Sequence, residues 1–204
     1  IGTSYGAETS FTTLAIAPTV SATATVTSIT GSTATSGGTI TSDGGASVTS
    51  RGLVWGTSSG ASTYSVTSGT GTGTFTSSLT GLSIATNYFV RSFATNSVGT
   101  VYGPEVSFST PNTAILASTI TSTITSSTVV IGGVLSSTGG ATTTIGIKYS
   151  TDINFGTYST TTVSTNINAA GTYTTTLTGL SSLTTYYAKA FATNTAGTTE
   201  TSVI

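Results

Sequence analysis

The residues on which most enzymes depend are nearly absent from this chain. Its 204 residues include no His, Cys or Met, four Lys and Arg, and five Asp and Glu. Without His or Cys there is no thiolate nucleophile, no Ser–His or Cys–His pair and no ordinary zinc site. Five acids spread along the chain argue against a carboxylate pair. We therefore expect no enzymatic activity, with no catalytic residue, no metal and no cofactor.

Two short stretches place a cation between aromatic rings. Side chains two residues apart share one face of a strand. The pattern occurs at Phe89, Arg91 and Phe93 and again at Tyr187, Lys189 and Phe191. Rings beside a cation form a platform on which a sugar or a protein partner can dock. The alternative is that Arg91 and Lys189 cover their own aromatic neighbours, or that the rings belong to the core.

A calcium site is a second candidate, at Asp152 and Asn154 with Asp43 expected nearby in the fold. Calcium takes six to eight oxygen ligands, usually several of them carboxylates. One Asp in a loop more often caps a turn through its own backbone. The sequence therefore favours turn residues at both places.

The composition indicates a β-structure whose surface consists largely of hydroxyl side chains. The chain has 54 Thr and 33 Ser, and only 4% of its residues are charged. Thr, Val, Ile, Tyr and Phe favour β-strands, and 25 Gly suit many turns. A formal charge of -1 excludes the basic surface of a nucleic-acid-binding protein. No apolar run approaches 18 residues, so no membrane span is expected.

An internal repeat of about 97 residues sets the domain organisation. Leu79–Leu82 recurs as Leu177–Leu180, and Phe93–Asn96 recurs as Phe191–Asn194. This period suits whole β-sandwich domains. We expect one repeat at residues 14–110 and a second at residues 111–204. In the first, strands are expected at residues 19–28, 32–41, 47–56, 63–68, 72–80, 86–96 and 101–109.

The two ends are out of phase with this repeat. Residues 2–13 match residues 99–110, so the chain opens with the final strand of a repeat whose body is absent. The segment at residues 1–13 includes Tyr5, Glu8, Thr9, Ser10 and Phe11. Residues 200–204 echo residues 8–12, which suggests a last hairpin three residues shorter and a last strand that stops early.

The residues around the repeated Leu-Thr-Gly-Leu motif resemble the tyrosine corner of fibronectin type III domains. They are Leu82, Thr86, Tyr88, Val90, Ala94, Asn96 and Gly99, and then Leu180, Thr184, Tyr186, Ala188, Ala192, Asn194 and Gly197. The resemblance implies two tandem fibronectin III-like Greek-key β-sandwiches plus an N-terminal orphan strand. It also implies that Leu82 and Leu180 plug the sandwich and that the hydroxyls of Tyr88 and Tyr186 hydrogen bond across the corner.

The stretch from Tyr88 to Gly103 is also similar to tandem repeats of large bacterial surface adhesins and extracellular fibre proteins. It implies a structural subunit of an extracellular filament or adhesin stalk at the cell surface. The expected partners are copies of the chain itself, joined head to tail by β-strand addition of residues 1–13, and surface glycans. One alternative is that residues 1–13 complete a preceding repeat in one long polypeptide. Another is a ligand-binding or spacer module of a secreted carbohydrate-active enzyme.

Overall fold

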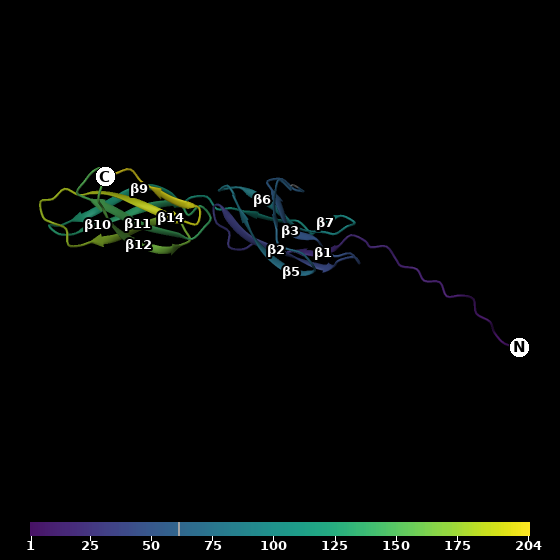
Figure 1. The fold of residues 1–204 in the computed structure, drawn as a ribbon. Coiled ribbons are helices and arrows are strands. Elements are labelled where there is room, and N and C mark those ends of the chain that lie inside the picture. Colours follow the sequence, from purple (N-terminus) through teal and green to yellow (C-terminus); the bar gives the residue numbers. More distant parts are fainter. Residues whose placement is uncertain (61) are drawn as a thin grey trace. The chain divides into compact units, whose positions relative to one another are not determined.

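The computed structural model describes residues 1–60 and 62–204 and consists of antiparallel strands joined by turns (Figure 1). No helix occurs among these residues, and hence none that is long and apolar enough to cross a membrane. The all-β prediction is confirmed. By compactness the chain divides into one unit of Ile1–Thr25, Ser36–Ser77 and Phe89–Val106, and a second of Val26–Thr35, Ser78–Tyr88 and Ser107–Ile204. These limits cut across strands, so the expected domain boundaries stay predictions.

The first repeat forms two sheets. One has the strand order β1-β2-β5, and the other has β4-β3-β6-β7 with β8 also paired to β6. The strands are β1 (Thr19–Thr23), β2 (Thr33–Ser42), β3 (Ser50–Gly56), β4 (Tyr64–Thr67), β5 (Gly73–Thr80), β6 (Asn87–Thr95), β7 (Thr100–Tyr102) and β8 (Val106–Ser109). Ile40, Leu53 and Val90 are fully buried, which places one face of each sheet on the core.

The second repeat repeats this arrangement. Its sheets have the orders β13-β10-β9 and β12-β11-β14-β15. The strands are β9 (Ile115–Ile124), β10 (Val129–Ser137), β11 (Thr143–Ser150), β12 (Ser159–Ile167), β13 (Gly171–Leu177), β14 (Tyr187–Asn194) and β15 (Gly197–Glu200). Leu135, Ile145 and Ile147 lie at its centre with almost no exposed surface. The chain thus crosses between two sheets in each repeat, as in a Greek-key sandwich.

A glycine in the central strand of each repeat lets the two sheets approach closely. A Cβ built on Gly38 of β2 would lie 2.4 Å from the Cβ of Ser92 on β6. A Cβ built on Gly133 of β10 would lie 3.0 Å from the Cβ of Ala190 on β14. Any larger side chain would have to push the facing strand away, so these positions fix the spacing of the sheets.

The expected strand at residues 101–109 is two strands. β7 ends at Tyr102 and β8 begins at Val106. The break falls at residues 103–105, where Pro104 has no N–H to donate to a ladder. The N–H of Gly103 still donates to the Ser92 carbonyl at 2.8 Å. The proline therefore divides the strand while both halves stay paired with β6.

The predicted shortening of the last hairpin is wrong. Phe191 pairs with Glu200 across β14 and β15, as Phe93 pairs with Tyr102 across β6 and β7. The two hairpins therefore have the same length, and Glu200 takes the place of Tyr102 and not that of Glu105. The short sequence likeness around Glu200 does not predict this pairing, because the turn and the buried face of the strand set the register of a hairpin, and one matching acid does not.

Residues 1–13 are an extended trace without strand pairing (Figure 1). Tyr5 and Phe11 are 89% and 91% exposed. The first hydrogen bond that ties this end of the chain to a turn runs from the Ile16 N–H to the Gly44 carbonyl, at 2.9 Å. The segment is thus free to pair with another sheet edge, because its backbone donors and acceptors are not used within the chain's described residues.

Candidate functional site

The tyrosine corner of the first sandwich is closed. Leu82 and Tyr88 are 6% and 3% exposed. The Tyr88 hydroxyl accepts a hydrogen bond from the Ser83 N–H at 3.0 Å, which confirms the expected corner bond. The ring of Phe108 on β8 stacks on Tyr88 with centroids 5.6 Å apart. The apolar end of this sandwich is therefore sealed by its own last strand.

Thr110, the residue after β8, hydrogen bonds to the backbone of the same corner. The Thr110 N–H donates to the Thr86 carbonyl at 3.0 Å, and its hydroxyl donates to the Ser83 carbonyl at 2.6 Å. The Thr86 N–H in turn donates to the Thr110 hydroxyl oxygen at 3.0 Å. Ser109 adds a side-chain hydrogen bond to Asn87. Thus Ser109 and Thr110 satisfy backbone and side-chain groups of the corner turn.

The corner of the second sandwich has the same hydrogen bond but is more open. The Tyr186 hydroxyl accepts from the Ser181 N–H at 3.1 Å. Tyr186 and Leu180 are only half-buried, so Leu180 fills this end of its sandwich less completely than Leu82 fills the first. Tyr149 lies beside Tyr186 with centroids 6.5 Å apart. The neighbouring Leu183 is fully exposed.

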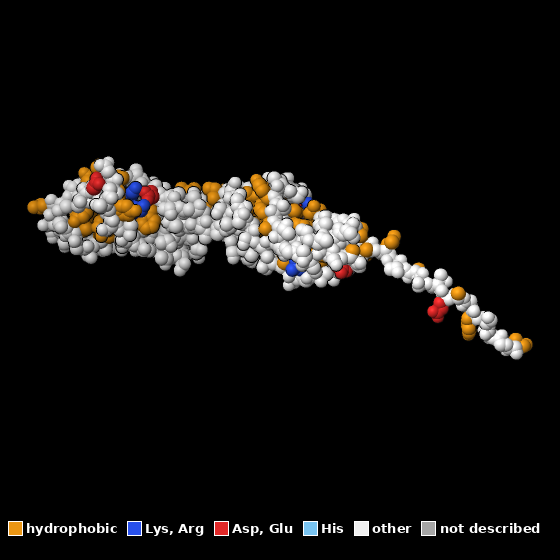
Figure 2. All heavy atoms as spheres, viewed as in Figure 1, with side chains coloured by type: hydrophobic (Ala, Val, Ile, Leu, Met, Phe, Trp, Pro, Cys, Tyr) orange, Lys and Arg blue, Asp and Glu red, His pale blue; other side chains and the backbone are white. Residues whose placement is uncertain are grey.

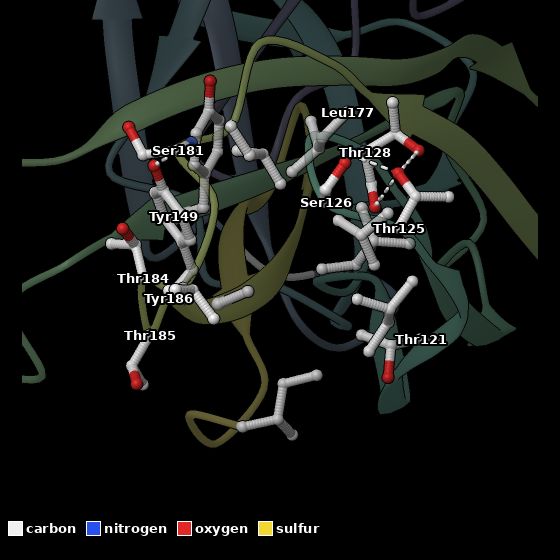
Figure 3. A pocket seen from close by; sticks show the side chains of 17 residues that line it. Thr121, Thr125, Ser126, Thr128, Tyr149, Leu177, Ser181, Thr184, Thr185 and Tyr186 are labelled. Atoms are coloured by element: carbon white, nitrogen blue, oxygen red, sulfur yellow. Dashed lines mark hydrogen bonds between the residues drawn. The ribbon is translucent and has the colours of Figure 1, made fainter.

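A cavity of about 500 Å³ opens beside this second corner. Figure 3 shows Tyr149, Tyr186 and Ser181 on one side of it and Thr121, Thr125 and Thr128 across from them. Its apolar lining includes Ile131, Leu177, Leu180, Tyr186, Ala188 and Ile204. Sequence analysis did not foresee this cavity. It could have been found by aligning Glu200 with Tyr102, because Ile204 then matches Val106 and no described residue matches Phe108. The likeness of Glu200 to Glu105 obscured this alignment.

The first predicted aromatic–cation platform lies on the outer face of β6. Phe89, Arg91 and Phe93 alternate there with buried residues. The Arg91 guanidinium lies 4.6 Å from the centroid of Tyr102 and donates a hydrogen bond to the Gly60 carbonyl at 2.7 Å. Arg91 therefore covers the ring of Tyr102 on the neighbouring strand β7. A docking role for this face stays a prediction.

The second platform forms around Glu200 on the outer face of β14. Lys148 and Lys189 are direct cross-strand neighbours, and Glu200 bridges them with one oxygen each. The Lys189–Glu200 distance is 2.6 Å. Lys189 lies 4.8 Å from the centroid of Phe155, and Lys148 lies 5.0 Å from that of Tyr158. Phe191 adds a further ring 5.9 Å from the Lys148 ammonium, and Tyr187 is half-buried on the same strand face.

Hydrogen bonds from Lys148 and then Lys189 hold the pKa of Glu200 below its ordinary value. The same contact with Glu200 raises the pKa of Lys148. Sequence analysis identified Lys189 but missed Lys148 and Glu200. Alternation along residues 143–150 places Lys148 on the outer face, but its partner comes from a hairpin whose register the sequence did not reveal.

The two aspartates of the candidate calcium site, Asp152 and Asp43, cap turns. Asp152 accepts the N–H groups of Asn154 at 2.9 Å and Gly156 at 3.0 Å, and these bonds lower its pKa. Asp43 accepts the Gly45 N–H at 2.9 Å. Within residues 1–60 and 62–204, no three His, Cys, Asp or Glu side chains gather as metal ligands would.

No protein-family model and no curated protein matches the chain. Among solved structures it is similar to the FN1–FN3 domains of chicken CNTN1, with 17% identity and a TM-score of 0.44. That match covers 93% of this chain and 66% of the other, just under two thirds of its length. A two-domain fibronectin type III segment from chicken tenascin matches at 17% identity and a TM-score of 0.37, over 91% of this chain and 95% of that one. The sheet orders of the two repeats confirm the expected pair of β-sandwiches.

Proposed function

We propose that this chain is a structural subunit of an extracellular bacterial filament or adhesin stalk. Its two fibronectin III-like sandwiches form the body of the subunit, and residues 1–13 join it to the next copy. The contact joins two different surfaces of the chain, so repeated copies give an open filament.

This proposal is carried by one observation: two segments of similar sequence differ in whether they pair with a β-strand. Residues 99–110 form β7 and β8 and pair with β6 inside the first sandwich. Residues 2–13 closely repeat that sequence and pair with nothing among the described residues, with Tyr5 and Phe11 exposed. A lone strand with apolar side chains gains stability by adding to a free sheet edge.

The surface suits close packing of copies. In Figure 2 most of the visible surface is white, the colour of the backbone and of uncharged polar side chains, with hydrophobic side chains in orange between them and only a few Lys, Arg, Asp and Glu. A net charge of -1 leaves little electrostatic repulsion between copies. These properties, and the scarcity of catalytic residue types, favour a building material over an enzyme. Surface glycans remain a second proposed partner, through the outer faces of β6 and β14.

The test is electron microscopy and size-exclusion chromatography of the purified chain and of a variant with residues 1–13 replaced by a Gly/Ser segment of the same length. We expect the original chain to form filaments with a regular axial repeat and the variant to stay monomeric. A monomeric original chain, or a variant that forms the same filaments, would overturn the proposal. The spacer alternative predicts the monomer in both cases.

A further inference from the structure

The cavity of the second sandwich lies where the first sandwich holds Phe108. Ile204 exchanges backbone hydrogen bonds with Ala188, at 2.9 and 3.1 Å. By the hairpin register, Ile204 therefore takes the position of Val106, the first residue of β8. The position of Phe108 is two residues further along this strand line, beside Tyr186 and inside the cavity. The described second sandwich thus has an open position for a last strand, beside Tyr186, and Ile204 occupies only the first residue of that position. We call this open position the seat.

The backbone polar groups that line this seat also lack the hydrogen bonds that their counterparts make in the first sandwich. In the first sandwich, Thr110 engages the Thr86 backbone and the Ser83 carbonyl. The equivalent groups are the Thr184 backbone and the Ser181 carbonyl, and nothing in the part of the chain that the structure describes hydrogen bonds to them. The cavity therefore lacks both a ring and a threonine that its counterpart contains.

The exposed N-terminal segment carries these missing groups in the right order. In the sequence repeat, Phe11 corresponds to Phe108, and Thr12 and Thr13 correspond to the two residues that follow it. Phe11 is 91% exposed, so burying its ring removes apolar surface from water. None of the residues from Ser10 to Thr13 is charged, so the cavity would bury no unpaired charge.

We propose that the cavity beside Tyr186 binds Ser10–Thr13 of a second copy of this chain. Phe11 stacks on Tyr186, and Thr13 hydrogen bonds to the turn from Ser181 to Thr184. The inference deepens the proposed function, because it names the acceptor and the register of the strand addition.

The register excludes part of the N-terminal segment from the contact. Thr201 donates its N–H to the Ala190 carbonyl at 3.0 Å, as Gly103 does to Ser92. Thr201–Ile204 therefore already fill the positions that residues before Ser10 would take. Tyr5 consequently lies outside the seat, although its aromatic side chain is about as exposed as that of Phe11.

Cysteine cross-linking of the full chain tests the register, because the chain has no cysteine of its own. In the first sandwich, the side chains of Ser109 and Asn87 are in hydrogen-bond contact, and their counterparts are Thr12 and Thr185. We expect a Thr12→Cys chain mixed with a Thr185→Cys chain to form an intermolecular disulfide under mild oxidation. The matched control, Ser10→Cys with Thr185→Cys, is two residues out of register and should not cross-link. Equal cross-linking of both pairs, or of neither, would overturn the proposal.

Peptide binding tests the seat without requiring filaments. The acceptor is the full chain with Phe11→Ala, and the probe is a fluorescent peptide of residues 1–13. We expect the Phe11→Ala peptide to bind about 10- to 100-fold more weakly than the original, because the buried ring is lost. The Tyr5→Ala peptide should bind as well as the original. A peptide that fails to bind, or a loss at Tyr5 equal to that at Phe11, would overturn the proposal.

The two experiments separate this inference from the proposed function. If the peptide binds and the Thr12→Cys and Thr185→Cys chains cross-link, but the original chain forms no filaments, the acceptor site stands and the filament function fails. If filaments form but the Thr12→Cys and Thr185→Cys chains do not cross-link, the filament function stands and this acceptor site is wrong.

Discussion

Phe108 stacks on Tyr88 at a centroid distance of 5.6 Å, so the last strand of the first sandwich covers the ring of the corner tyrosine. Both rings are almost fully buried. The Tyr88 hydroxyl accepts a hydrogen bond from the Ser83 N–H. The same tyrosine therefore serves the turn through its oxygen and the core through its ring, and substitutions can separate the two contributions.

We expect Tyr88→Ala to lower the free energy of unfolding by about 3 to 5 kcal/mol, because it removes a buried ring and leaves a cavity. Tyr88→Phe should cost about 1 kcal/mol, the contribution of one hydrogen bond. Chemical denaturation of the purified variants measures both values. Unchanged stability in both variants would show that the corner assignment is wrong.

The same pair of substitutions at Tyr186 is a control for burial. Tyr186 keeps the corner hydrogen bond but is only half-buried beside the cavity. Tyr186→Ala should therefore cost less than Tyr88→Ala in a chain kept monomeric by dilution. Equal costs at the two positions would contradict the difference in burial.

Gly38→Ala should destabilise the first sandwich by about 1 to 3 kcal/mol, because its new Cβ would lie 2.4 Å from that of Ser92. Gly133→Ala should cost less, since the corresponding distance to Ala190 is 3.0 Å. Gly99→Ala is the matched control, because a Cβ there meets nothing within 4 Å. Thermal melting of the three variants measures the order, and a Gly38→Ala variant as stable as Gly99→Ala would contradict it.

The ion pair at Glu200 makes the stability of the second sandwich depend on pH. The pKa of Glu200 is lowered from its ordinary 4.5 by Lys148 and Lys189, so its contribution is present above pH 4.5 and is lost as the pH falls through the folded-state value. The pKa of Lys148 is raised, so its contribution is present below 10.5 and is lost as the pH rises through its folded-state value.

We expect Glu200→Gln to flatten both limbs of this pH profile. Glu105 and Asp152 also have lowered pKa values, so part of the acid limb should persist in the variant. Denaturation midpoints from pH 2 to 11 for the original chain and the variant provide the comparison. Parallel profiles for the two proteins would show that the Glu200 contacts do not form in solution.

Calcium should leave the melting temperature unchanged, and chelation should do the same. Both carboxylate oxygens of Asp152 already accept backbone N–H groups. We expect Asp152→Asn to lower stability modestly through the turn, to the same extent with and without calcium. A sharp rise of the melting temperature with calcium that Asp152→Asn abolishes would contradict the turn assignment.

The sequence by itself determined the fold class and its repetition. Thr-rich alternating segments favour strands whatever their partners, and the recurrence of Leu79–Leu82 at Leu177–Leu180 shows two copies of one architecture. The tyrosine corner followed in the same way, because its bond joins Tyr88 to Ser83, five residues away. The shared outer face of Phe89, Arg91 and Phe93 needed only the two-residue period of a strand.

Tertiary structure alone decided how the last strands are placed. Glu200 resembles Glu105 in its local sequence, but backbone hydrogen bonds give it the position of Tyr102. From that register come the Glu200 bridge between Lys148 and Lys189 and the open cavity beside Tyr186. Such features could not be predicted because they join residues up to 83 positions apart, from Thr121 to Ile204, and such contacts arise only when the sheets pack. The register of a strand depends on its turn and on which of its faces is buried, and that face is decided only when the two sheets pack together.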